Sequence, residues 1–107
     1  MTDLTFIARV AAMLLAAPGP VRRAWSGRRR LQILAWTHLG ADPKVAAWLT
    51  EAAEQPNPDL VPPLSGALGR AILADPVFAG AVRQLVVDAY AEPGLAQDLP
   101  DPAPGLD

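Results

Sequence analysis

The chain has 107 residues, no cysteine and a formal net charge of −2. This length allows one domain with a modest core, and the lack of cysteine excludes disulfides, thiolate metal ligands and cysteine nucleophiles. Alanine accounts for 21 residues and the aromatic residues for only six, a composition typical of helices. The sequence therefore predicts an all-α protein, and the absence of cysteine fits a cytoplasmic location.

The net charge is unevenly distributed along the chain. Residues 1–40 carry six arginines against one aspartate, a net charge of +5. Residues 41–107 carry ten acidic residues against three basic ones, a net charge of −7. Such asymmetry favours contact with an acidic partner, or contact between the two halves of the chain.

The first predicted element is a helix over residues 3–17. Its apolar run contains Arg9 and is too short to span a bilayer, and only Asp3 precedes it, unlike the basic start of a signal peptide. One apolar stripe of this helix has helical spacing and consists of Phe6, Val10, Met13 and Ala17. It is flanked by Ile7 and Leu14. We expect a buried amphipathic helix, with attachment to a membrane surface as the alternative.

The arginine-rich segment over residues 20–39 has two interpretations. Read as one helix, it places on one face Ala24, Gly27, Leu31, Leu34, Ala35 and His38. A short turn, a break at Ser26-Gly27 and a second helix fit nearly as well, because glycine weakens a helix. In either case Gly40 supplies the C-cap. The chain thus forms a compact bundle of five short helices, or of six if this segment is broken.

Two further helices begin with an aspartate as N-cap and a proline at the first helical position, at Asp42-Pro43 and at Asp75-Pro76. The core face of the first is predicted to contain Val45, Trp48, Leu49 and Ala52, and that of the second Phe78, Ala81, Val82, Leu85 and Ala89. A helix over residues 63–73 lies between them, after a stiff proline-rich connection. The residues of this helix that we expect to face the core are Leu64, Leu68 and Ile72.

The domain organisation is predicted from the last segment. After Tyr90 the sequence becomes rich in proline and acidic residues. We expect residues 1–91 to form a single helical bundle domain and residues 92–107 to form a flexible tail or linker. No segment alternates for long enough to predict a strand.

Patterns for catalysis or metal binding are absent from the sequence. His38 is the only histidine, and it lies on an apolar stripe without a nucleophile nearby in the sequence, so we interpret it as a partly buried structural residue. Glu51 and Glu54 are interpreted as a solvated pair. No cluster of metal ligands and no phosphate-binding loop occurs. The sequence predicts a protein without enzymatic activity, metal, cofactor or small-molecule substrate.

The arginines of the segment 21–30 are the strongest functional signal. In one continuous helix, residues seven apart align, and a basic ridge forms beside a tryptophan. Because arginine pairs with carboxylates through two hydrogen bonds and is enriched in interfaces, we interpret the ridge as a surface that contacts protein. The alternatives are a solvated face, nucleic acid and lipid; a pI of about 5.2 argues against nucleic acid. The candidate interaction residues are Arg22, Arg23, Trp25, Arg28, Arg29, Arg30 and Trp36.

The layout of the chain resembles that of the small helical effector-associated and death-like adaptor domains of actinobacterial conflict and signalling proteins. The segments that carry the resemblance are VRRAWSGRRRL and NPDLVPPLSGALGRAILADPVFAGAVRQL. Pro63-Leu64, Ala67-Leu68 and Asp75-Pro76 match the positions of the family's helix starts and leucines. The resemblance spans about residues 20–90. It implies a helical bundle that binds partners like with like.

We therefore expect an adaptor module that self-associates or recruits a protein partner through the basic ridge and an acidic surface. The acidic surface would include residues such as Asp42, Glu51, Glu54 or Asp59 on another copy. A regulator that binds nucleic acid through the same ridge is the alternative. A membrane partner is not expected.

Overall fold

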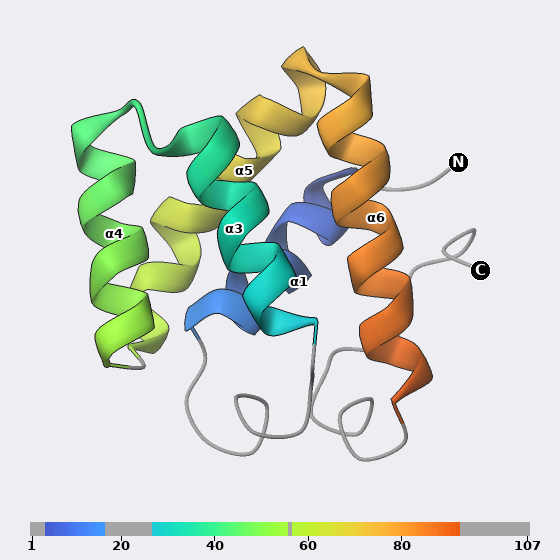
Figure 1. The fold of residues 1–107 in the computed structure, drawn as a ribbon, viewed down its shortest axis with the longest axis horizontal. Coiled ribbons are helices and arrows are strands. Elements are labelled where there is room, and N and C mark those ends of the chain that lie inside the picture. Colours follow the sequence, from blue (N-terminus) through green and yellow to red (C-terminus); the bar gives the residue numbers. More distant parts are fainter. Residues whose placement is uncertain (1–3, 17–26, 56, 93–107) are drawn as a thin grey trace.

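The computed structural model describes residues 4–16, 27–55 and 57–92. Within these ranges there are five α-helices, one short 3-10 helix and no strand, which confirms the predicted all-α fold (Figure 1). The helices are α1 (Leu4–Ala16), α3 (Arg28–Leu39), α4 (Pro43–Glu54), η1 (Pro58–Leu60), α5 (Val61–Ala74) and α6 (Pro76–Ala91). The predicted tail beyond residue 92 lies outside the described residues.

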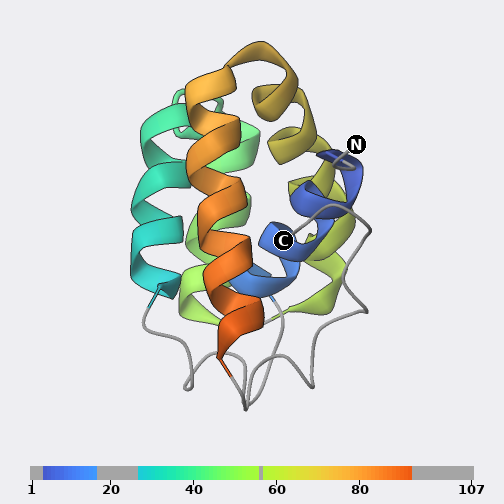
Figure 2. The same cartoon turned by 90° about the vertical axis from the view of Figure 1, so that its right-hand side faces the viewer.

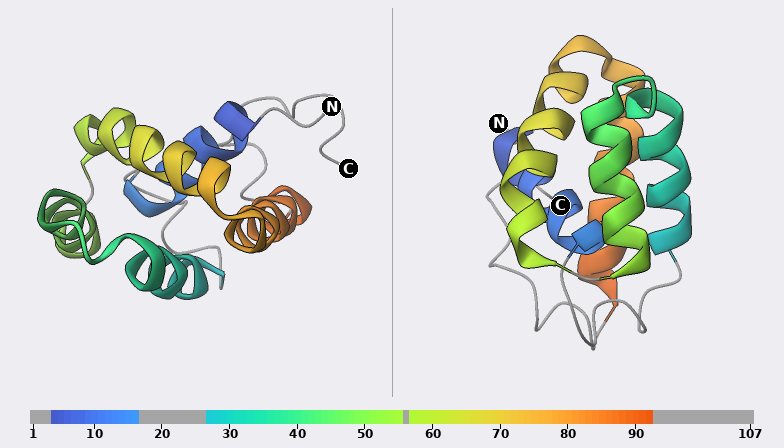
Figure 3. Two further views of the ribbon diagram at one scale, coloured as in Figure 1. Left: turned by 90° about the horizontal axis from the view of Figure 1, so that it is seen from above. Right: turned by 90° about the vertical axis from the view of Figure 1, so that its left-hand side faces the viewer.

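The helices are arranged in two layers. Seen from above, α4, α3 and α6 form one layer and α1 and α5 the other (Figure 3). From the side, α6 lies between α3 on one flank and α1 with α5 on the other (Figure 2). α3 and α4 run in opposite directions, joined by a short turn (Figure 1). One face of α3 is consequently turned away from the second layer.

Helix α1 is buried on almost every side, which the predicted amphipathic stripe did not anticipate. Its buried residues are Ile7, Ala8, Val10, Ala11, Ala12, Leu14, Leu15 and Ala16. Phe6 and Met13, two members of the predicted stripe, are only half-buried, and Ala17 lies outside the described residues. The reason is that α3, α4, α5 and α6 all pack against α1. The solvent-exposed face of this helix is therefore narrower than that of an ordinary surface helix. No helix within the described ranges has both the length and the apolar character to cross a membrane.

The remaining helices bury the faces that their periodicity predicts, with few exceptions. The buried residues of α4, α5 and α6 are Val45, Leu49, Ala52, Leu64, Ala67, Leu68, Ile72, Phe78, Val82, Val86 and Ala89. Trp48, predicted to be buried, is half-buried. Ala81 and Leu85 are half-buried as well, and Val86 takes a core position that the prediction omitted.

The two Asp-Pro helix starts are confirmed. Asp42 Oδ1 accepts a hydrogen bond from the Lys44 amide at 3.0 Å. Asp75 Oδ1 accepts from the amides of Val77 and Phe78 at 2.9 and 3.2 Å. These bonds satisfy amides that have no partner inside the first turn of a helix.

The proline-rich connection before α5 is more regular than predicted. It contains η1, and α5 begins at Val61 rather than at Pro63. Asn57 caps η1, because its side-chain oxygen accepts from the Asp59 amide at 3.0 Å. Prolines are tolerated in the first turn of α5 because the amides they lack would have no partner there.

Helix α3 begins at Arg28, with Gly27 as its N-cap. This start agrees with the alternative that places a helix boundary at Ser26-Gly27. Residues 20–26 of the predicted segment lie outside the described residues. Gly40 is the C-cap, as predicted, and its amide donates to the Trp36 carbonyl at 2.9 Å.

Candidate protein interface

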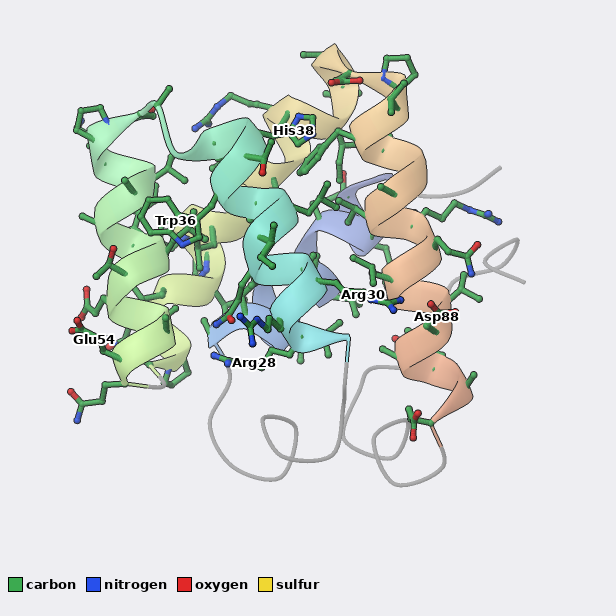
Figure 4. All side chains as sticks on the ribbon, viewed as in Figure 1. Arg28, Arg30, Trp36, His38, Glu54 and Asp88 are labelled. Carbon is green, nitrogen blue, oxygen red and sulfur yellow. The ribbon has the colours of Figure 1, made fainter. Side chains whose placement is uncertain are left out.

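Four of the seven candidate interaction residues are described, and all four lie on α3. They are Arg28, Arg29, Arg30 and Trp36. The other three, Arg22, Arg23 and Trp25, lie outside the described residues. Arg29 and Arg30 are exposed and Trp36 is 41% exposed, whereas Arg28 is half-buried. Arg28 is thus the inward-facing candidate, while the other three are exposed, with Arg30 extending from α3 toward α6 and Trp36 toward α4 (Figure 4).

Arg28 lies at the carboxyl end of α1 (Figure 4). Its Nη2 donates to the Leu15 carbonyl across a long 3.5 Å. With the amide oxygen of Gln32 turned toward it, the guanidinium also donates to that oxygen at 3.0 and 3.1 Å. Because a cation near a helix carboxyl end is favoured by the helix dipole, Arg28 stabilises the end of α1. We therefore omit it from the outward surface.

The outward face of α3 combines two arginines with two large apolar residues. Arg29, Ile33 and Trp36 follow one another at helical spacing, and Arg30 lies beside them. Ile33 is 57% exposed and Trp36 41% exposed, so both leave apolar surface in water. We call Arg29, Arg30, Ile33 and Trp36 the α3 surface. The sequence-based prediction did not include Ile33, although its position four residues after Arg29 places both on one face of a helix.

The indole of Trp36 is held against the turn between α3 and α4. A Cβ atom added to Gly40 would lie 2.8 Å from Trp36 Cε3 and 2.5 Å from the Trp36 carbonyl oxygen. Only glycine allows this approach, since real Cβ contacts are not that short. Figure 4 shows Trp36 pointing from α3 toward α4. The turn therefore fixes the orientation of the exposed indole.

Two glycine substitutions are expected to change stability in opposite directions. Gly40→Ala forces Trp36 to move, and we expect it to lower the free energy of unfolding by about 1–3 kcal/mol, as overpacking does. Gly80→Ala, in the interior of α6 with nothing within 4 Å of the new Cβ, should raise it by about 0.5–1 kcal/mol. Urea denaturation followed by circular dichroism measures both. Equal effects would show that Trp36 does not depend on Gly40.

The arginines of the α3 surface lie where the electrostatics of an isolated helix disfavour them. The first turn of α3 contains no acidic residue, and Arg29 and Arg30 stand there at the positive end of the helix dipole. Neither forms an ion pair with an acidic residue in the described ranges. In the described ranges, the predicted contact between the two halves of the chain therefore includes no ion pair of Arg29 or Arg30.

His38, for which the sequence predicted a partly buried structural role, lies between the end of α3 and the start of α6. Its Nδ1 lies 3.6 Å from Asp75 Oδ2, and its ring centroid lies 4.5 Å from that of Phe78. The side chain is 29% exposed. A pocket of about 350 Å³ opens beside it, with Asp42 and Arg70 among its lining residues. Nowhere in the described ranges do three potential His, Cys, Asp or Glu ligands come together.

The chain matches no protein-family model, no curated protein and no solved structure. The resemblance to adaptor domains thus rests on the layout of helix starts and leucines alone. Function has to be inferred from the α3 surface itself.

Proposed function

We propose that the chain is a cytoplasmic, non-enzymatic interaction module that self-associates or recruits a protein partner through the α3 surface. The observation that carries this proposal is the exposure of Ile33 and Trp36 beside Arg29 on one face of α3, with Arg30 exposed at the edge of that face nearer α6 (Figure 4). Tryptophan and arginine are the residues most enriched among those that dominate binding energy at protein interfaces. The adaptor role implied by the resemblance to death-like domains agrees with such a surface.

The chemistry of the surface favours a protein over a nucleic acid. Tight binding to a phosphate backbone requires several cations along a ridge. The α3 surface contains two cationic side chains, those of Arg29 and Arg30. Exposed Ile33 and Trp36 instead suit a partner with an apolar contact area, and the guanidinium groups suit carboxylates at its rim. Binding to nucleic acid is the competing result of the test below.

Site-specific photocrosslinking tests the proposal. A benzophenone amino acid in place of Ile33, in cells of the organism that encodes the chain, should give ultraviolet-dependent adducts with protein. We expect the double substitution Arg29→Glu with Arg30→Glu to reduce their yield about tenfold or more, which corresponds to about 1.4 kcal/mol of lost binding free energy. An adduct of twice the chain mass identifies a second copy, and mass spectrometry identifies any other partner.

The same benzophenone in place of Val77 is the matched control. Val77 is an exposed apolar residue like Ile33, at 78% exposure, but it lies at the start of α6. Adducts that form equally from both positions, or that survive the double substitution, would contradict the proposal. Adducts that contain nucleic acid, with affinity that falls steeply as salt rises, would establish the competing function.

A further inference from the structure

We infer that the α3 surface binds the outer edge of α4 on a second copy of this chain, so that copies assemble head to tail. This inference rests on the proposed function and adds the identity of the partner. Its basis is that the chain carries a second exposed stripe whose charges and spacing complement those of the α3 surface.

The second stripe lies on α4. Its residues are Ala47, Thr50, Glu51 and Glu54, which we call the α4 stripe. All four are exposed and follow the spacing of one helical face. Figure 4 shows Glu54 on the outer side of α4, pointing away from α3. Neither glutamate forms an ion pair with a basic residue of the described ranges, and both side chains are exposed.

The two stripes match when the helices run in opposite directions. Arg29 and Trp36 are seven residues apart, as are Ala47 and Glu54, so each stripe is about 10.5 Å long at 1.5 Å per residue. An antiparallel contact brings the two arginines opposite the two glutamates. It then brings Ile33 and Trp36 opposite the small side chains of Ala47 and Thr50, where a bulky residue finds room.

The helix dipoles favour the same orientation. The arginines stand at the positive end of α3, and the last turn of α4 contains no basic residue. In the antiparallel contact, the arginines lie close to the negative end of α4 on the neighbouring copy as well as to its glutamates. A cost within the isolated chain thereby becomes an attraction between copies.

The contact is heterologous because the two stripes are different surfaces of one chain. Each copy that uses its α3 surface leaves its own α4 stripe available for the next copy. Such contacts produce rings if the rotation between copies closes, and open filaments if it does not. The assembly is expected to dissolve as salt rises, since its charges are exposed.

A charge exchange between two variants tests the inference. The first variant carries Arg29→Glu with Arg30→Glu, and the second carries Glu51→Arg with Glu54→Arg. Neither should unfold, because each places its new charges at the helix end that the dipole favours. Sedimentation velocity over a concentration series, on nuclease-treated samples, should show salt-sensitive assembly of the unmodified chain and monomers for each variant alone. An equimolar mixture of the two variants should assemble again, because every contact in it pairs opposite charges.

The control is Arg9→Glu with Arg70→Glu, which makes the same change in net charge as the first variant, at two exposed arginines on α1 and α5. This variant should assemble like the unmodified chain. If both test variants are monomeric and their mixture stays monomeric, the α3 surface is used but the α4 stripe is not its partner, which overturns the inference and leaves the proposed function intact. An unmodified chain that remains monomeric, or that assembles only with nucleic acid, also overturns it.

Discussion

Ala12→Asp is expected to cause the largest loss of stability of any single substitution considered for this chain. Ala12 is fully buried in α1, a helix with four other α-helices packed against it. A carboxyl group at this position has neither water nor a hydrogen-bond partner, and burying such a group costs several kcal/mol. We expect a decrease of about 4–5 kcal/mol or more in the free energy of unfolding, a large part of the 5–15 kcal/mol typical of a domain.

Arg9→Asp is the control, because Arg9 lies on the same helix but is exposed. The same new side chain should change stability there by less than about 0.5 kcal/mol, as surface substitutions do. Urea denaturation followed by far-ultraviolet circular dichroism compares the two variants. A mild effect of Ala12→Asp would mean that α1 has a hydrated side after all.

Phe78→Ala is expected to have the second largest effect. The ring is 1% exposed and contacts the imidazole of His38, so its loss opens a cavity between α3 and α6. We expect a decrease of about 3–5 kcal/mol in the free energy of unfolding, the range for phenylalanine removed from a core. Thermal and urea denaturation both measure it.

Phe6→Ala removes the same side chain from a half-buried position, where the ring stacks on Tyr90 at 6.3 Å. Because less apolar surface returns to water there, its cost should be clearly smaller than that of Phe78→Ala. Similar costs for the two variants would show that Phe78 does not fill a closed core position.

Local signals in the sequence predicted most of the helix starts and core faces. Asp42 and Asp75 predicted the starts of α4 and α6 because an N-cap acts on amides within three residues. Gly40 predicted the end of α3 because a C-cap is equally local. The apolar faces of α4 and α5 followed from periodicity because each of these helices keeps an exposed side opposite its buried one. α1 did not follow, since periodicity does not reveal how many neighbours surround an apolar helix.

Only part of the candidate site was predicted, because the local sequence does not show which distant segments pack beside a residue. Arg29, Arg30 and Trp36 were proposed as interaction residues, and the structure leaves all three on the outside of α3. Arg28 turns inward because the carboxyl end of α1, 13 residues earlier in the chain, lies beside it. Such a long-range neighbour has no trace in the local sequence. Ile33 was overlooked because the candidate residues were chosen for arginine and tryptophan, and an exposed isoleucine carries neither charge nor aromatic character.

The burial of α1 also has a consequence for synthesis of the protein on the ribosome. α1 is translated before α5, which packs against it and starts at Val61, and before α6. At about 5–20 residues per second, α1 emerges several seconds before these helices exist to cover it. During that interval the nascent chain presents an apolar helix to the cell. The order of the helices thus leaves the apolar surface of α1 without its final neighbours until α5 and α6 have been synthesised.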